Sequence, residues 1–192
     1  MFLGVETILV GVLVALVLIG IIFAIWYIST SNELKRLEQS VEESESGIDV
    51  ALAKRYDSLT KMLDTTKGYA KHEAETLSNV IKWRNGLPKD ATLEDKKEFA
   101  SQLSQVEKGI NVVVEQYPQL KADSVFAKLQ SAIMDSEEHL QAARRLFNSN
   151  VKAINNKIVS FPSSWVAKKI NMSKKEYFEV EEVKRQDVKM EF

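Results

Sequence analysis

The residues closest to a metal-site motif surround the first of two histidines. His72-Glu73 begins like the zinc-protease motif, in which a second histidine follows one helical turn later. Position 76 holds Thr76 instead, and His139 lies in a different segment of the chain. A site that joins both histidines to nearby carboxylates is an alternative that this spacing does not favour. We therefore predict that the chain has no metal site.

The composition gives no support to other catalytic chemistry. The chain has no cysteine, which excludes disulfides, thiolate catalysis and cysteine-ligated zinc. Its 7 glycines are too scattered to form a phosphate-binding loop. Neither histidine has serine and aspartate at the spacing of a catalytic triad. We predict no catalytic, cofactor-binding or metal-binding residues, and a protein that is not an enzyme.

The distribution of charge argues against a nucleic-acid partner. All 26 Lys and Arg residues follow position 34, and all acidic residues except Glu6 follow the apolar run of residues 8–28. The polar part of the chain therefore carries 26 basic and 26 acidic groups. Without an excess of positive charge, there is little counterion release to hold nucleic acid.

Four polar residues in the last third of the chain are spaced seven, four and seven apart: Glu137, Arg144, Asn148 and Asn155. On a helix they would line up beside the apolar stripe. We interpret them as a polar border that fixes the register between helices, with Asp49 or Arg55 as candidate partners. A polar groove that binds a ligand is the alternative.

A basic cluster follows Pro162 and comprises Lys168, Lys169, Lys174 and Lys175. We expect a solvated surface, with contact to acidic lipid headgroups as the alternative.

Residues 8–28 form a run of 21 residues without a charged or strongly polar side chain. As a helix the run is about 31 Å long, close to the thickness of the hydrocarbon core of a bilayer. Trp26 and Tyr27 lie at its end, where amphipathic rings favour the membrane interface. A cleaved signal peptide would need a basic start and a shorter apolar core. We predict an uncleaved transmembrane anchor in residues 1–31, bound to the lipid bilayer through residues 8–28.

The residues around the anchor predict its orientation and a contact. Lys35 and Arg36 flank the C-terminal end of the run, and no basic residue flanks the other end. The positive-inside rule then places the soluble domain in the cytoplasm, on a single-pass protein of the cell membrane. Small residues four apart allow two such helices to approach closely, which predicts a homo-oligomer. These residues are Gly11, Ala15, Gly20 and Ala24.

Apolar residues recur three and four apart along the rest of the chain, which predicts long helices. The first stripe runs from Leu34 to Ile81, with Ser44 and Thr66 in its gaps, and Gly86 and Pro88 end it. Gly68 is a weak point within that helix, so its continuity is left open. A second helix begins near Thr92, which can cap it, and a third stripe runs from Phe126 to Phe161. We predict an all-α fold, with an antiparallel up-and-down helical bundle over residues 32–171.

Residues 172–192 form a charged tail. Val188, Met190 and Phe192 alternate with charged residues, a pattern typical of a strand. An otherwise helical fold offers this strand no partner, so we predict pairing with a second copy of the chain or with another protein. A frayed, solvated end is the alternative.

Several short motifs resemble those of LemA-family bacterial membrane proteins. They are Gly47 to Leu52 with Lys54 to Asp57, Thr66 to Glu73 with Thr76-Leu77, Glu115 to Ala122, Ala143 to Asn148, Phe161-Pro162, Tyr177 to Glu179 and Val188 to Phe192. Phe147 stands where Tyr is more usual, and Asn171-Met172 stands where Gly-Phe is expected. The resemblance implies an N-terminal anchor and a mainly helical bundle, and it implies no defined biochemical activity.

Together these patterns favour a membrane-anchored scaffold or adaptor that self-associates or recruits an unknown protein partner. The alternative is a sensory or regulatory bundle that binds a ligand and signals through a partner. An enzyme is the interpretation that the residues favour least.

Overall fold

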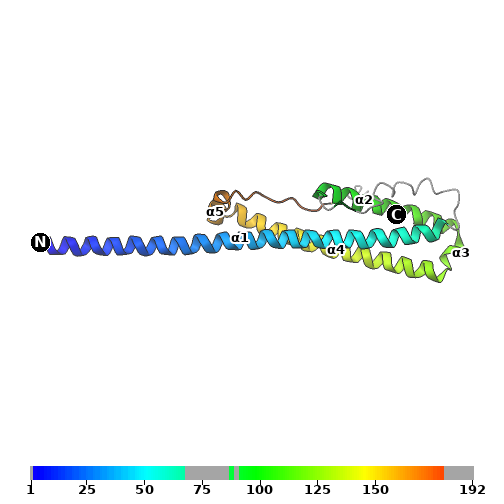
Figure 1. Ribbon diagram of the computed structural model, residues 1–192, viewed down its shortest axis with the longest axis horizontal. Coiled ribbons are helices and arrows are strands. Elements are labelled where there is room, and N and C mark those ends of the chain that lie inside the picture. Colours follow the sequence, from blue (N-terminus) through cyan, green and yellow to red (C-terminus); the bar gives the residue numbers. More distant parts are fainter. Residues whose placement is uncertain (1, 68–86, 89–90, 180–192) are drawn as a thin grey trace, which may run out of the picture. The chain divides into compact units, whose positions relative to one another are not determined.

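The computed structural model describes residues 2–67, 87–88 and 91–179, and their regular structure is entirely helical (Figure 1). The predicted all-α class is therefore confirmed. The helices are α1 (Phe2–Lys67), α2 (Leu93–Gln116), α3 (Pro118–Lys121), α4 (Ser124–Val159) and α5 (Ser163–Lys169). The predicted extension of the first helix beyond Gly68 lies outside the described residues, as does the predicted strand at Val188, Met190 and Phe192.

The chain forms two compact units. Unit 1 comprises residues 1–42 and 149–176, and unit 2 comprises residues 43–148 and 177–192. Helices α1 and α4 each contribute one part to unit 1 and another to unit 2. The predicted divisions at residues 31 and 171 stay predictions.

Local side-chain chemistry starts α2 where the sequence predicts, and a cap of the same kind starts α4. Thr92 Oγ1 accepts a hydrogen bond from the backbone N–H of Asp95 at 3.2 Å, and the Asp95 carboxylate accepts one from the Thr92 N–H at 2.9 Å. This capping box confirms Thr92 as the cap of α2. Asp123 serves α4 similarly, because its Oδ1 accepts from the N–H groups of Val125 and Phe126 at 2.7 and 3.2 Å.

The core of unit 2 is built from the apolar stripes of α1, α2 and α4. Ile48, Phe99 and Leu140 are among its most deeply buried members. Ser44, Thr66 and Ser136, which occupy stripe positions, are buried as well. Thr66 and Ser136 donate their hydroxyl protons to backbone carbonyls of their own helices, so their burial leaves no unpaired donor.

Within unit 2, α1 and α2 run in the same direction. Lys96 contacts Glu45 and Asp49, whereas Arg55 contacts Glu107, so both helices advance together along the contact. The expectation of antiparallel neighbours depended on short connections. Lys67 and Leu93 are separated by a connection that is too long for that argument to apply.

In unit 1, α1 and α4 are antiparallel, as predicted. Lys157 pairs with Glu33 at 2.8 Å, and the Asn150 side chain donates to the Ser40 carbonyl at 3.0 Å. Helix α5 packs its buried face, Val166 and Ala167, against Leu34 of α1, and Ile158 and Ile170 adjoin this cluster.

Helix α5 ends in a left-handed residue. Asn171 has a φ of 55°. The N–H of Met172 donates to the carbonyl of Ala167 at 2.9 Å, and the N–H of Asn171 donates to that of Lys168 at 3.3 Å. This is the Schellman arrangement, in which the residue after the left-handed one packs back on the helix. Met172 does so, because it lies against the Leu34 cluster.

Candidate functional site

The apolar segment of α1 is the first candidate for a functional surface. Within the described part of the chain it is the one helix that is long and apolar enough to span a bilayer, with a mean hydropathy of 3.3 in its most apolar stretch. None of that stretch is buried in the protein, and Ile8, Leu16 and Ile25 are each more than 60% exposed. A helix of the soluble core would be covered by protein. Continuous exposed apolar surface on this scale marks a binding surface, for which a bilayer is the natural cover.

The predicted oligomer face lies in the same segment. Gly11, Ala15, Gly20 and Ala24 are all exposed. A Cβ atom built on Gly11 or Gly20 would meet nothing within 4 Å, so within the chain these positions are open.

A buried arginine joins the three long helices of unit 2. The side chain of Arg55 on α1 is 4% exposed, and its Nη2 donates to Glu107 of α2 at 2.8 Å. Its Nη1 lies 2.9 Å from Oε2 of Glu137 on α4. This confirms the predicted pairing of Glu137 with Arg55. The Nη1 approach is not aligned as a hydrogen bond, and Arg55 Nε has no hydrogen-bond partner among the residues that the structure describes.

A second charged junction lies at the start of α2. Lys96 is buried, and its Nζ lies 2.8 Å from Oε1 of Glu45 and 2.8 Å from Oδ1 of Asp49. Burial disfavours the charged form, but the hydrogen bonds to Asp49 and Glu45 outweigh it and raise the pKa of Lys96 above its ordinary value of 10.5. The lysine is therefore held as a cation that ties α2 to α1.

The Lys96 junction was not anticipated from the sequence, although a signal for it exists. Lys96 lies three residues before Phe99, and Arg55 lies between Leu52 and Leu59, so both cations occupy positions on apolar stripes. A charge on such a stripe must be paired to be buried. The partners could not be read from spacing, because they belong to other helices.

The two asparagines of the predicted polar border bind the tail rather than α1. In unit 2, the Asn148 side chain donates to the Phe178 carbonyl at 3.1 Å and accepts from the Phe178 N–H at 2.8 Å. In unit 1, Asn155 makes the same pair of bonds with Lys175, both at 2.8 Å. Each amide thus satisfies both backbone groups of one tail residue, as a neighbouring strand would.

Arg144, the remaining member of the polar border, also contacts the tail. Its guanidinium lies over the Phe178 ring, 5.4 Å from the centroid, and Phe178 is 1% exposed. The four border residues therefore make internal contacts, and they do not share one ligand groove.

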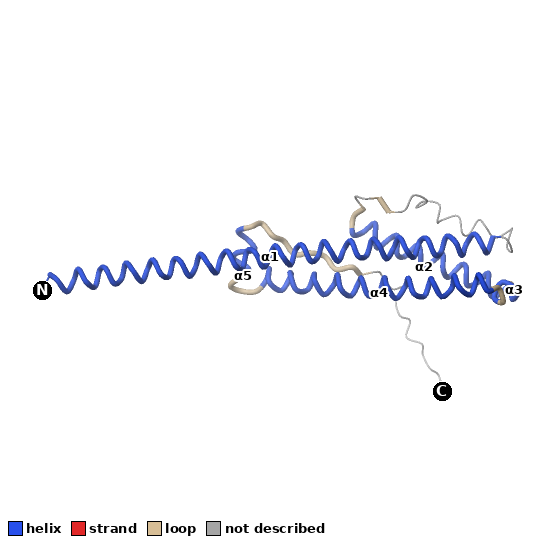
Figure 2. The backbone as a smooth tube through the Cα atoms, turned by 60° about the horizontal axis from the view of Figure 1, so that its bottom comes forward, coloured by secondary structure: helices blue, strands red, loops and turns tan. Residues whose placement is uncertain are grey.

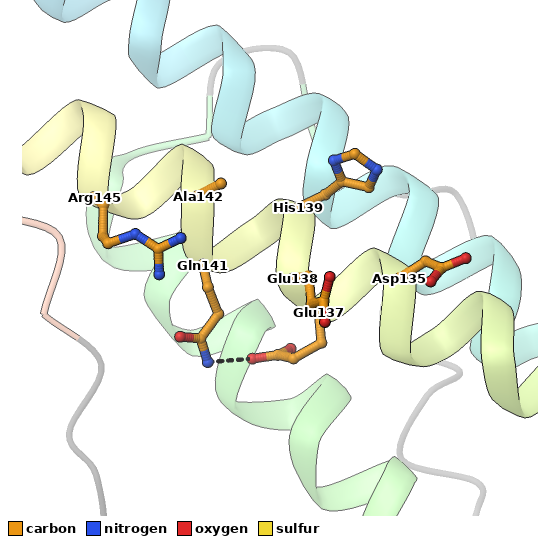
Figure 3. Close-up of a pocket in the computed structure, with 7 residues that line it drawn as sticks. All are labelled: Asp135, Glu137, Glu138, His139, Gln141, Ala142 and Arg145. Atoms are coloured by element: carbon orange, nitrogen blue, oxygen red, sulfur yellow. Dashed lines mark hydrogen bonds between the residues drawn. The ribbon is translucent and has the colours of Figure 1, made fainter.

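A surface depression runs along one face of α4 in unit 2 (Figure 3). The described residues that line it come from that helix: Asp135, Glu137, Glu138, His139, Gln141, Ala142 and Arg145. In the close-up, Gln141 turns to Glu137, to which it donates a hydrogen bond at 3.1 Å. His139 is exposed, and His72 lies outside the described residues. Among the residues that the structure describes, no cluster has the ligands to hold a metal ion.

In the basic cluster that follows Pro162, one lysine forms an ion pair and three are exposed. Lys175 pairs with Glu38 at 2.8 Å. Lys168, Lys169 and Lys174 are exposed. Lys169 lies 5.9 Å from the centroid of the Trp165 ring.

Fold and surface together define a class: an all-helical protein whose first helix carries a candidate membrane span. Comparison with known proteins narrows that class. The model of the LemA family matches residues 44–192. The chain is also 32% identical over 171 residues to Protein LemA of Metamycoplasma hominis, covering 88% of this chain and 78% of that protein. The chain belongs to the LemA family.

Proposed function

We propose that this protein is a non-catalytic, membrane-anchored scaffold that presents helical surfaces to partners at the cell membrane. The observation that carries the proposal is the continuity of α1, which runs without interruption from Phe2 to Lys67. The apolar segment and the part of unit 2 that contains Arg55 are therefore stretches of one helix. The helix that carries the apolar segment thus also supplies residues, Arg55 among them, on which α2 and α4 of unit 2 assemble.

The charged side chains support a structural role. Arg55 and Lys96 each pair with two carboxylates of other helices, and the border asparagines bind backbone. Such contacts specify which helices meet and in what register. They occupy the groups that a catalytic site would need free.

Self-association is the simplest partnership for the scaffold. Gly11, Ala15, Gly20 and Ala24 offer a face on which a second anchor can pack. The tail residues Val188, Met190 and Phe192 offer a strand for pairing with another chain. We place the chain beyond residue 31 in the cytoplasm, because Lys35 and Arg36 are exposed directly after the anchor.

The scaffold is tested by sizing the full chain after gentle detergent extraction. We expect a defined assembly larger than one chain. The variant Gly11→Leu/Gly20→Leu should reduce its size, whereas the matched variant Val12→Leu/Ile21→Leu should not. Deletion of residues 186–192 tests the tail contribution separately. A monomer in every case, with no co-purifying protein, would contradict the proposal.

A regulatory module is a second candidate, favoured by the charged junctions of unit 2. Among the described residues, Arg55 Nε is buried without a hydrogen-bond partner, and Asp49 Oδ1 and Glu137 Oε2 form ion pairs with Lys96 and Arg55 without an aligned hydrogen bond. Unsatisfied buried groups cost energy, so a second helix packing that satisfies them would lie close in free energy. Hydrogen exchange of unit 2 tests this candidate. Two populated states in the natural protein, and a single state in the variant Arg55→Met, would favour regulation. A single state would favour the scaffold.

A further inference from the structure

Helix α5 and the turn before it carry an exposed aromatic surface, for which the proposed scaffold function gives no reason. α4 ends at Val159, two residues before Phe161, so the helical periodicity that predicted Phe161 as a core residue no longer applies there. Phe161 is 90% exposed, which corrects that prediction. Trp165, one helical turn further on, is 46% exposed. Two large aromatic side chains exposed this close together are costly to leave in water.

The position of α5 along α1 indicates what covers Phe161 and Trp165. The Trp165 ring lies 5.8 Å from the Phe23 ring and 6.0 Å from the Tyr27 ring, measured between centroids. Both partners belong to the apolar run that ends at Ile28. Phe23 lies about 7.5 Å inside that end, since a helix rises about 1.5 Å per residue. If the run spans the bilayer, Trp165 lies at the boundary between headgroups and acyl chains. Figure 2 shows α5 beside α1.

Charge on the same element fits the same occupant. Lys168 and Lys169 are exposed in the last turn of α5, while Val166 and Ala167 face the protein. Lys157 and Lys175 are already paired with Glu33 and Glu38. An aromatic pair beside exposed lysines is the composition of a helix that lies in the membrane interface.

We propose that Phe161 and Trp165 insert into the headgroup–acyl boundary and that Lys168 and Lys169 bind the phosphates of anionic lipids. The chain then contacts the bilayer twice, through the span and through α5. The second contact fixes the depth and the rotation of α1, because a helix held at one side cannot turn freely about its axis. This inference rests on the proposed anchor.

The natural chain has no cysteine, so single labels can be placed cleanly. The full chain is reconstituted in phosphatidylcholine–phosphatidylglycerol vesicles with an environment-sensitive fluorophore on Phe161→Cys, Ile19→Cys or Gln39→Cys. Nitroxide-labelled lipids then report depth. We expect a nitroxide near the lipid headgroups to quench most of the emission of the label at 161. A nitroxide deep in the acyl chains should quench most of the emission of the label at 19. The label at 39, exposed and about 16 Å beyond Ile28 along α1, should keep its emission.

The outcomes separate the two proposals. An unquenched label at 19 would overturn the anchor itself. A quenched label at 19 with an unquenched label at 161 would overturn only the α5 contact. For the lysines, Lys168→Glu/Lys169→Glu should lower quenching at 161 in phosphatidylglycerol-containing vesicles to the level in phosphatidylcholine alone. Lys152→Glu/Ala153→Glu, exposed on α4 of the same unit, is the matched control. Equal quenching with both lipid compositions would overturn the anionic-lipid contact.

Discussion

At the scale of single residues, the most demanding backbone position that the structure describes is Asn171, which has a φ of 55°. Asn171-Met172 replaces the Gly-Phe that the family resemblance leads one to expect. The structure explains the exchange: position 171 needs a positive φ, and position 172 needs an apolar side chain that packs back on α5. Asparagine is the residue other than glycine that best tolerates this conformation, and methionine fills the apolar position.

The left-handed cap makes a stability prediction. Asn171→Val should lower the free energy of unfolding by about 1–2 kcal/mol, because a β-branched residue is strained at positive φ. Asn171→Gly should leave it unchanged or slightly raised. Thermal unfolding of the detergent-solubilised protein, followed by circular dichroism, measures both. Equal losses in the two variants would show that the asparagine side chain, rather than the backbone angle, matters.

Lys96 makes a pH prediction. Its pKa is raised above 10.5 in the folded protein, so its stabilising effect is fully present below pH 10.5 and is lost as the pH rises through the folded value. Lys96→Met should therefore destabilise the protein at pH 7, and the difference from the natural protein should shrink at higher pH. Urea unfolding of both proteins at several pH values measures this difference. A difference that stays constant up to pH 12 would refute the ion-pair explanation.

At the scale of elements, asparagines organise a segment that has no secondary structure of its own. Asn148 and Asn155 lie seven residues apart, on the same face of α4, and each binds the backbone of one tail residue. Side-chain amides can do this because each carries both a donor and an acceptor. The tail is thereby held as far as Phe178 without a sheet.

This arrangement predicts that the variant Asn148→Ala loses stability and loses hydrogen-exchange protection at Phe178. Asn148→Ala removes both bonds to Phe178, which should lower the free energy of unfolding by about 1–3 kcal/mol and speed hydrogen exchange at the Phe178 amide. Ser149→Ala, at an exposed neighbouring position, should change neither. Exchange measured by mass spectrometry distinguishes the two. Unchanged protection at Phe178 would mean that packing of its ring alone holds the tail.

At the scale of the whole molecule, the apolar part of α1 is the one candidate membrane span among the described residues. It carries no charge from Ile8 to Ile28, and other described parts of the chain contact it only near its end, where Trp165 packs on Phe23 and Tyr27 and where Trp26 and Tyr27 are half-buried. Membrane insertion is the expected result of the cost of leaving this surface in water.

The anchor is tested by charge at its centre. Leu16→Arg/Val17→Arg should impair insertion, since each charge costs about 2.5–3.5 kcal/mol at the middle of a bilayer on insertion scales. Leu16→Ala/Val17→Ala is the matched control and should remain in the membrane fraction after carbonate extraction. Carbonate-resistant association of the arginine variant would contradict the transmembrane assignment.

The sequence by itself determined the features that depend on local order along the chain. The length of the apolar run, the stripes of α2 and α4, the Thr92 cap and the family motifs can all be read from residues that are neighbours in sequence or one helical turn apart. A partner for Glu137 on the first helix was also expected, but the choice of Arg55 over Asp49 came from the structure.

Only the tertiary structure decided which elements meet. The same direction of α1 and α2, the binding of Asn148 and Asn155 to the tail, and the packing of Trp165 on Phe23 join residues far apart in sequence. The spacing of apolar residues assigns a residue to one face of a helix, but it does not show which other element that face will pack against. That choice is made by the packing of all the faces at once, and so Phe161, placed in the core by its spacing, lies exposed beyond the end of α4.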